Sequence, residues 1–299
     1  MESKKKKIKR MVENIILVIL IFIFLACLGL IVNRIMTYRT EDRENKKIAN
    51  EYTFTLKMPV ATKDEAGEED VAEQVYDASY DTQGVDWDSL YAINPDYVGW
   101  IRMANGVNYP IVKGAETNEY LHKNFYGEHA RSGSIMMNAN NKADYSDPNT
   151  IIYGHNMADG SMFSMNRKYM DEAYANENPY FFIHIKGGYF TYRIIAAKRD
   201  KDGCEGYSLA IDSEEGLRKF NDFYNNRAYY KHEEICSGER YVTLSCCNGR
   251  SGTIYRLLLL GKMECFTSYN GTRISPEEYF RTKPISENYN PYVNDYFGG

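Results

Sequence analysis

The sequence predicts a mostly β domain preceded by one membrane-spanning helix. Short apolar runs recur along the second two-thirds of the chain, and Gly, Asn, Asp and Pro separate them. Gly187 and Gly188 lie between two of these runs and indicate a tight hairpin. About eight short strands of this kind predict either a closed barrel or a sandwich. The runs cover residues 98–103, 107–112, 133–137, 150–153, 180–185, 189–197, 240–246 and 253–263.

The apolar segment from Ile15 to Val32 is the candidate membrane helix. It contains 18 residues without a charged side chain, which at ~1.5 Å per residue just spans a hydrocarbon core of ~30 Å. A cleaved signal peptide is the alternative, but Asn33, Arg34 and Ile35 follow the run without a clear cleavage site. We therefore expect an uncleaved anchor at 15–32.

Basic residues precede the apolar segment and predict its orientation. Lys4 to Lys7, Lys9 and Arg10 lie in a tail at 1–14. The positive-inside rule keeps such a tail in the cytoplasm, so everything after the anchor is expected outside the cell membrane.

A polar segment follows the anchor. Residues 33–85 are mostly acidic, with Glu65, Glu68, Glu69, Asp70 and Glu73 close together, and we interpret them as a solvated stalk that is partly helical. The composition changes near residue 86, where the folded domain at 86–299 is expected to begin.

Three helical segments are expected within this domain. A short helix from Asp86 to Asn94 is stopped by Pro95. A second amphipathic stretch covers 162–175. Residues 212–227 predict a longer helix, in which Asp212 and Glu215 can form a capping box.

Net charge and cysteine usage exclude several functional classes. The chain carries −5 overall, and because residues 1–14 hold six basic and two acidic groups, the remainder carries −9. Such an acidic domain argues against nucleic-acid binding. The six cysteines follow no CxxC or metal spacing and no disulfide framework, so we expect no metal and no cofactor.

Cys247 is the candidate nucleophile. The apolar strand ends at Thr243-Leu244-Ser245-Cys246-Cys247 and opens into the glycine-rich turn 248–252. A cysteine in an apolar strand is more often a small core residue than a nucleophile. A cysteine at the point where a strand opens into a loop is, however, placed where exposed catalytic groups are usually found.

His155 is the candidate acid–base group. It directly follows the apolar run 150–153 and lies between Gly154 and Asn156. Glycine permits a sharp turn, so the ring can be presented at a strand end. His184 lies within a strand, and the remaining histidines lie in polar regions.

Arg256 lies nine residues after Cys247 in an otherwise apolar strand. A guanidinium there needs an anion or a hydrogen-bond acceptor. A structural ion pair with a carboxylate is one interpretation, and a donor to an oxyanion during acyl transfer is the other. Arg250 is a weaker candidate for the same role.

These motifs closely resemble those of the class B sortases, a family of cysteine transpeptidases. The family's Thr-Leu-x-Thr-Cys motif is similar to 243–247, with Cys246 in place of the second threonine. Its Tyr-Gly-His-Asn-Met segment matches 153–157, and its arginine matches Arg256. Upstream, 93–96, 99–101 and 108–112 also resemble the family, so the likeness covers about 86–265.

The resemblance implies a sortase-type barrel of eight strands, with N-terminal helices and a helix between the sixth and seventh strands. It implies that Cys247 attacks a C-terminal sorting motif of a secreted protein, that His155 manages the protons and that Arg256 steadies the oxyanion. An amine of a peptidoglycan precursor, or a pilin lysine, would resolve the thioacyl-enzyme. We expect Ser245, Thr243 and Asn156 to contact the substrate.

The sequence is also compatible with two other functions and with another cysteine as the nucleophile. The same residues could serve a hydrolytic cysteine peptidase of the cell envelope, or the scaffold could be an inactive binding module. Cys246 neighbours the expected nucleophile; the Thr243-Leu244 register favours Cys247, whereas a count back of ten from Arg256 favours Cys246.

Overall fold

A computed structural model describes residues 2–56, 78–247 and 253–282. The chain divides into two compact units, Met1–Asn45 and Lys46–Gly299. The acidic cluster of the expected stalk, the side chains of Lys4 to Lys9, and Arg250 lie outside what the structure describes.

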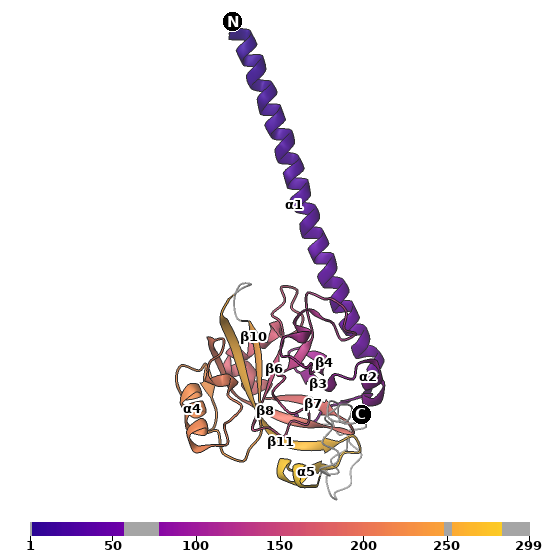
Figure 1. Cartoon of the computed structure of the whole chain (residues 1–299), viewed down its shortest axis with the longest axis vertical. Coiled ribbons are helices and arrows are strands. Elements are labelled where there is room, and N and C mark those ends of the chain that lie inside the picture. The colour runs from indigo at the N-terminus through magenta and orange to yellow at the C-terminus, as the bar shows by residue number, and fades with distance from the viewer. Residues whose placement is uncertain (1, 57–77, 248–252, 283–299) are drawn as a thin grey trace, which may run out of the picture. The chain divides into compact units, whose positions relative to one another are not determined.

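The first unit consists of helix only. Helix α1 covers Glu2–Tyr52, and its last turns belong to the second unit (Figure 1). From Glu13 onward α1 is long and apolar enough to cross a membrane, and its most apolar stretch is not buried. Large apolar side chains of this helix are exposed; Phe22, for example, is 69% exposed and Leu30 is 71% exposed.

The second unit is built around a closed barrel of eight strands, as the resemblance implies. The strands follow the circular order β11-β10-β6-β5-β4-β3-β7-β8, and pairing of β8 with β11 closes the ring. Their bounds are β3 Tyr97–Met103, β4 Asn108–Val112, β5 Ile135–Met137, β6 Asn149–Tyr153, β7 Tyr180–Ile185, β8 Gly188–Lys201, β10 Tyr241–Cys247 and β11 Tyr255–Ser268.

Short elements extend this ring. Strand β9 (Tyr230–Lys231) pairs with β8, β12 (Arg273–Ile274) pairs with β11, and β1 (Thr53–Thr55) pairs with β2 (Gln83–Val85). The 3₁₀ segments are η1 Glu119–His122, η2 Ser164–Met170 and η3 Glu205–Tyr207. The expected hairpin joins β7 to β8 through Lys186 and Gly187, whose φ of 84° favours glycine.

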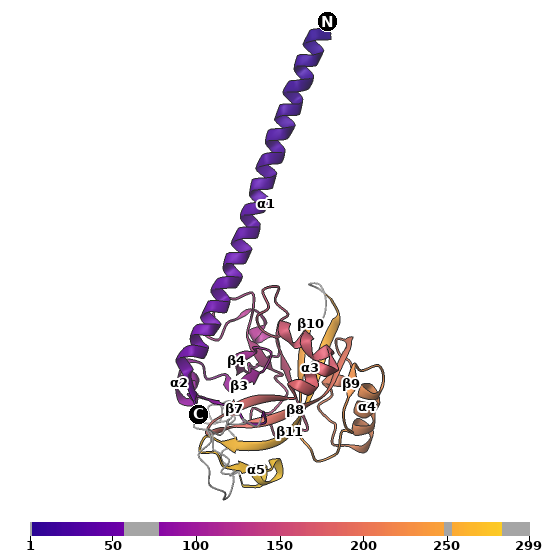
Figure 2. The ribbon, with the colours of Figure 1, turned by 180° about the vertical axis from the view of Figure 1, so that it is seen from behind.

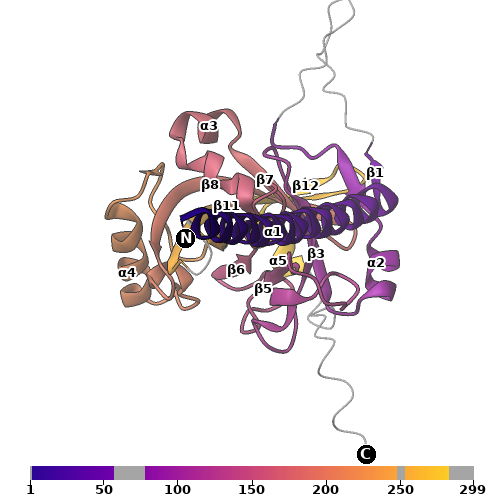
Figure 3. The same cartoon turned by 90° about the horizontal axis from the view of Figure 1, so that it is seen from above.

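Helices cover the outside of the barrel. Helix α2 (Trp87–Ile93) and helix α4 (Glu214–Asn225) lie on opposite sides of it (Figures 1 and 3), and α3 (Glu172–Glu177) is seen from behind in Figure 2. Helix α4 falls between the sixth and seventh barrel strands, where the sequence places a helix. Its N-cap is Ser213, which accepts from the backbone N–H of Gly216, so the expected capping pair of Asp212 and Glu215 was wrong. The segment 162–175 contains η2 and only the start of α3.

Three apolar clusters hold these layers together. Alternate residues of the strands fill the barrel interior, among them Val242, Leu244 and Leu257. The outer face of β8, β10 and β11 packs against Phe220 and Tyr224 of α4. The end of α1, with Ile48 and Ala49 buried, and Leu90 of α2 pack over the β3–β5 side. The compact unit thus includes residues 46–52 and 78–85. The division into a tail at 1–14, an anchor at 15–32, a stalk at 33–85 and a catalytic domain at 86–299 stays a prediction.

A buried polar network ties the segment before α2 to the barrel. Asp81, 3% exposed, accepts from His184 Nε2 at 2.8 Å and pairs with Arg102. Tyr269 Oη lies 3.1 Å from His184 Nδ1. Burial alone would raise the pKa of Asp81, but the hydrogen bond from His184 and the charges of His184 and Arg102 lower it.

We expect Asp81→Asn to destabilise the domain by about 2–3 kcal/mol, because it disrupts the hydrogen bond of the buried His184 and leaves the partly exposed Arg102 without its carboxylate. Urea unfolding at pH 7 measures this cost. The lowered pKa of Asp81 means that its contribution is present above the unfolded-state pKa of about 3.9 and is lost as pH falls through the lower folded value.

Asp88→Asn is the matched control for this measurement. Asp88 pairs with Lys186 at 2.8 Å, but both side chains are well exposed, so its loss should cost at most about 1 kcal/mol. Equal costs for the two variants would show that the Asp81 network does not stabilise the fold.

Candidate active site

Strand β10 separates the two adjacent cysteines. Its side chains alternate, so Val242, Leu244 and Cys246 face the barrel interior. Cys246 is 5% exposed, and burial raises the pKa of its thiol to about 12. Cys247 is partly exposed at the end of the strand. A thiol that stays protonated at neutral pH is a poor nucleophile, which leaves Cys247 as the candidate.

The three expected chemical groups line one groove. Cys247, His155 and Arg256 all border a cavity of about 270 Å³ on the outside of the barrel. The cavity is also lined by Thr117, Asn118, Leu121, Ser134, Met136, Tyr153, Gly154, Asp202, Ser245 and Cys246. His155 lies 92 residues before Cys247 and Arg256 lies nine residues after it, and the sheet brings all three together.

Strand pairing accounts for the convergence. Strands β6 and β10 are parallel, with Tyr153 opposite Ser245. His155 and Cys247 each follow two residues after that pair, so both emerge at the same edge of the sheet. Strand β11 is antiparallel to β10, and its register sets Arg256 directly opposite Cys247.

Gly154, which precedes His155, is closely packed against the core. Its N–H donates to Ser245 O at 3.0 Å, and an added Cβ would come within 2.6 Å of Ile135 and Phe163. Any larger residue here would displace the core beneath the histidine. The sequence suggested that a glycine is needed before His155 for a sharp turn; the structure shows that close packing requires it.

A backbone carbonyl selects the tautomer of His155. Nε2 lies 2.8 Å from Leu121 O, which can only accept, so Nε2 carries the proton. Nδ1 is then the ring nitrogen available for proton transfer. Leu121 belongs to η1, and the close approach of Gly133 to Leu121 O helps to set the position of that carbonyl.

His122 adds a second imidazole to the site. Its ring stacks on that of His155 with centroids 5.8 Å apart and planes inclined by 15°. Burial lowers the pKa of His155, the Leu121 hydrogen bond opposes this, and the nearby charges of His122 and Arg256 lower it further. His155 is thus biased toward its neutral form.

Arg256 forms an ion pair and also borders the groove. Nη2 donates to Asp202 Oδ2 at 2.9 Å, and Nη1 donates to Thr253 O at 2.7 Å. The two interpretations of this arginine from the sequence are therefore compatible. Asp202 orients the guanidinium, which stays 21% exposed at the groove.

The three expected substrate-contact residues lie in different positions. Ser245 lines the groove, and its hydroxyl lies 2.7 Å from Tyr207 Oη. Asn156 donates from Nδ2 to Cys247 O at 2.9 Å and so holds the main chain of the cysteine. Thr243 is fully buried and donates to Asn149 Oδ1, so the structure places it away from the groove.

Several groups at the site were not found from the sequence. They are Leu121, His122, Asp202 and Tyr207, which act on His155, Arg256 and Ser245 through contacts from distant segments. Tyr207 also stacks on Tyr153, with centroids 6.0 Å apart. Position in the sequence carries no signal for such partners, because each depends on how a loop folds back over the barrel.

Known proteins of one family resemble this chain, although no family model matches it. Sortase B of Listeria monocytogenes is 32% identical over 164 residues, which are 53% of this chain and 65% of that protein, slightly less than two thirds. Sortase B of Staphylococcus aureus is 27% identical over 180 residues, covering 59% of this chain and 74% of that protein.

Solved structures extend the comparison to the fold. The structure of sortase B from Listeria monocytogenes superimposes with a TM-score of 0.52 and 30% identity, and the match covers 58% of this chain and 98% of that one. Sortase B of Clostridium perfringens gives a TM-score of 0.54 at 28% identity, with 59% and 98% covered. The structural match and the sequence identity agree, and the chain belongs to the class B sortase family.

Proposed function

We propose that this chain is a membrane-anchored cysteine transpeptidase that cleaves a C-terminal sorting motif of secreted proteins and transfers the acyl group to an amine. The observation that carries the proposal is the single groove bordered by Cys247, His155 and Arg256. A thiol, an imidazole and a guanidinium at one surface are what acyl transfer through a thioester requires.

The reaction divides into two acyl transfers. The Cys247 thiolate attacks the scissile carbonyl, and the resulting oxyanion is stabilised by Arg256, which Asp202 holds in place. His155 in its imidazolium form gives a proton from Nδ1 to the leaving amine as the C–N bond breaks and the thioester forms. The second amine then attacks the thioester and loses its proton to His155, which restores the thiolate and the imidazolium.

The remaining residues near the groove have positioning roles in this proposal. Leu121 O keeps the Nε2 proton of His155 away from the cysteine. Asn156 holds the backbone of Cys247, and Ser245 offers a hydroxyl to the bound peptide. Thr243 supports β10 through Asn149 rather than by contact with substrate.

Relatives support the two partner classes. A Staphylococcus aureus sortase B structure is described as a substrate complex, and another sortase B structure as a complex with triglycine. By analogy, a sorting-motif peptide and an amine acceptor are the expected partners here. We propose an amine of a peptidoglycan precursor as that acceptor, with a pilin lysine as the alternative.

The N-terminal helix supports a location at the cell membrane. The apolar part of α1 is exposed along its length, and the basic residues before it favour a cytoplasmic N-terminus with an extracellular catalytic domain. Anchoring would tether the catalytic domain to the membrane.

The proposed activity is tested by product analysis with a sorting-motif peptide library, with and without triglycine, using the detergent-solubilised full chain. We expect a ligated product when triglycine is present. Cys247→Ala should lower cleavage by at least about 10³-fold, because it removes the nucleophile. Cys246→Ala, the matched control, should keep cleavage within about threefold.

Other outcomes of the same assay separate the alternatives. Cleavage without ligation would identify a hydrolytic peptidase, and the absence of both, with no trapping by a thiol-reactive peptide, would identify an inactive binding module. If Cys246→Ala lost activity while Cys247→Ala kept it, Cys246 and not Cys247 would be the nucleophile.

The pH dependence of the reaction tests the role of His122. Cleavage should follow a bell-shaped curve, and the limb governed by His155 should lie below the ordinary histidine value of about 6.5. His122→Phe keeps an aromatic ring against His155 but removes the imidazole that lowers its pKa. That limb should therefore move to higher pH in kcat/KM measurements.

His129→Phe is the control for this shift, because its ring lies 6.4 Å from that of His122 and forms no ring contact with His155 among the described residues. An unmoved limb in His122→Phe would refute the electrostatic role of His122.

Membrane extraction tests the anchor. The full chain should resist alkaline carbonate extraction, whereas a variant carrying both Leu20→Lys and Leu25→Lys should be released, since each charge at the helix centre costs about 2.5–3.5 kcal/mol. Thr40→Lys with Glu44→Lys, beyond the apolar run, should stay in the membrane. Extraction of the unmodified chain would exclude an integral anchor.

A further inference from the structure

A basic hollow lies beside the groove and takes no part in the chemistry proposed above. It has a volume of about 310 Å³. Four basic side chains and one carboxylate border it, together with Tyr255. The charged residues are Lys198, Arg199, Lys201, Arg227 and Asp200. This excess of positive charge stands out because the chain after residue 14 carries −9.

Lys198 borders the hollow and is itself buried. It is 3% exposed, and its ammonium donates to Phe223 O at 2.6 Å and to Asn226 O. These carbonyls belong to the C-terminal end of α4, where a cation is favoured by the helix dipole. Lys198 therefore ties the end of α4 to β8 and sets the distance between the two walls of the hollow.

The single carboxylate is already engaged. Asp200 Oδ2 lies 3.5 Å from the ammonium of Lys198, and Oδ1 accepts from the N–H of Lys201. Asp200 therefore offsets mainly the charge of Lys198 and leaves the three other cations of the hollow uncompensated.

Those three cations have no ion pair with any described residue. Arg199 stacks over Tyr255 with its guanidinium carbon 4.2 Å from the ring centroid, which leaves its edge free to donate. Lys201 and Arg227 also border the hollow, one from β8 and the other from the segment after α4. In a domain whose other cations often meet a carboxylate, three unpaired ones around one hollow indicate an anionic ligand.

The backbone of Arg227 is a second and independent indication. Its φ of 59° is left-handed, at the position just after the α4 C-cap, Asn226, where glycine is the usual residue. A side chain with a Cβ is disfavoured in this conformation. Strain of this kind, held by an arginine at a cavity, is more typical of a ligand site than of a solvated surface.

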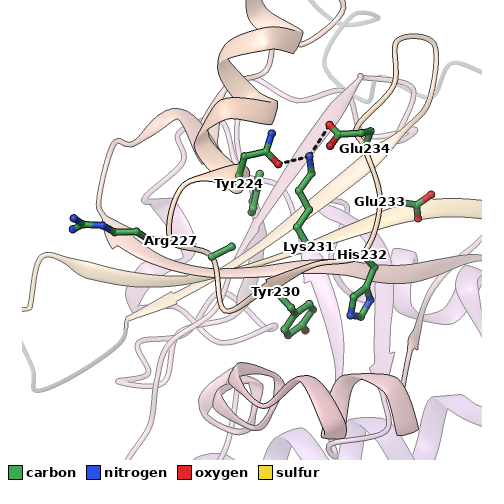
Figure 4. A pocket seen from close by; sticks show the side chains of 9 residues that line it. Tyr224, Arg227, Tyr230, Lys231, His232, Glu233 and Glu234 are labelled. Atoms are coloured by element: carbon green, nitrogen blue, oxygen red, sulfur yellow. Dashed lines mark hydrogen bonds and ion pairs between the residues drawn. The ribbon is translucent and has the colours of Figure 1, made fainter.

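The neighbouring cavity shows a different charge pattern. It is bordered by residues between Tyr224 and Glu234, and in Figure 4 Lys231 contacts Glu234 while Arg227 points away from both. Glu233 and Glu234 there offset the basic groups, so that cavity has no comparable positive excess.

The hollow is close to the reacting thiol. Cys247 pairs with Arg256 on β11, and Arg256 pairs with Asp200 on β8. Two strand spacings of about 4.8 Å therefore separate the row of the nucleophile from the edge of the hollow, or about 10 Å. Asp200 shares the face of Cys247, whereas Arg199 and Lys201 alternate to the opposite face of β8. A ligand held by these cations would therefore reach the groove around the end of β8, so only an extended substrate could occupy both places.

We propose that the basic hollow binds the phosphate groups of the amine-bearing substrate. The inference rests on the proposed transpeptidase function. Guanidinium groups bind phosphate in a bidentate manner, and several of them match a diphosphate better than a single carboxylate. A sorting-motif peptide carries no phosphate, whereas a lipid-linked wall precursor carries a diphosphate. A phosphate site in the hollow therefore favours the lipid-linked precursor as the amine acceptor.

The test compares two acceptors with the detergent-solubilised full chain: triglycine, and a lipid-linked diphosphate precursor that bears a glycine amine. The variant combines Arg199→Gln, Lys201→Gln and Arg227→Gly, of which the last also relieves the left-handed strain. We expect the KM for the precursor to rise at least about tenfold, while the KM for triglycine stays within about twofold. Inorganic pyrophosphate should inhibit transfer to the precursor in the unmodified enzyme only.

Arg167→Gln is the matched control, because Arg167 is an exposed cation of η2 remote in sequence from the hollow, and it should change neither KM. An unchanged precursor KM in the triple variant, or an equal rise for both acceptors, would overturn the proposal. Loss of binding to phosphatidylglycerol vesicles without precursor, at unchanged precursor KM, would assign the hollow to the membrane surface instead.

The experiments distinguish an error in the phosphate-site proposal from an error in the proposed transpeptidase function. If the unmodified chain ligates no amine at all, the proposed function falls, and calorimetric titration with pyrophosphate decides the phosphate site by itself. Binding by the unmodified chain that the triple variant loses would support a phosphate site, and equal or absent binding would remove it.

Discussion

Pairing of β10 with β6 on one side and β11 on the other is the constraint on which the site depends. The parallel β6–β10 register brings His155 to the end of the sheet where Cys247 lies, and the antiparallel β10–β11 register sets Arg256 opposite Cys247. Closure of the barrel by β8 and β11 then adds Asp202, which follows β8, against the guanidinium of Arg256. Without closure, Asp202 would lie at a separate sheet edge from the arginine that it orients.

Alternation along a strand then divides the chemistry from the core. On β10 one face supplies Leu244 and Cys246 to the interior, and the other supplies Ser245 and Cys247 to the groove. Two identical side chains in sequence thereby acquire opposite properties, since burial raises the pKa of one thiol and its neighbour stays at the surface. A register slip of one residue would exchange their roles.

The insertions between strands refine what the barrel provides. The segment containing η1 brings Leu121 O and the ring of His122 to His155. Leu121 O fixes the tautomer, while burial and, to a smaller extent, the charge of His122 lower the pKa of His155 against the opposing effect of the Leu121 hydrogen bond. The insertion between β8 and β10 brings Tyr207 to Ser245 and, at its α4 end, completes the basic hollow. The insertions thus supply the groups around His155 and Ser245, while the strands beneath them supply the core.

From the sequence alone we could predict the eight apolar runs, the apolar helix and α4, and could name Cys247, His155 and Arg256 as candidates, because strand periodicity and local motifs are encoded by neighbouring residues. It could not decide that Thr243 turns away from the groove, that Ser213 caps α4, or that the chain from residue 46 joins the compact unit. Nor could it reveal His122, Asp202 or the hollow at Arg227. Those features are contacts between segments far apart in the chain, and only the closed barrel brings such segments together.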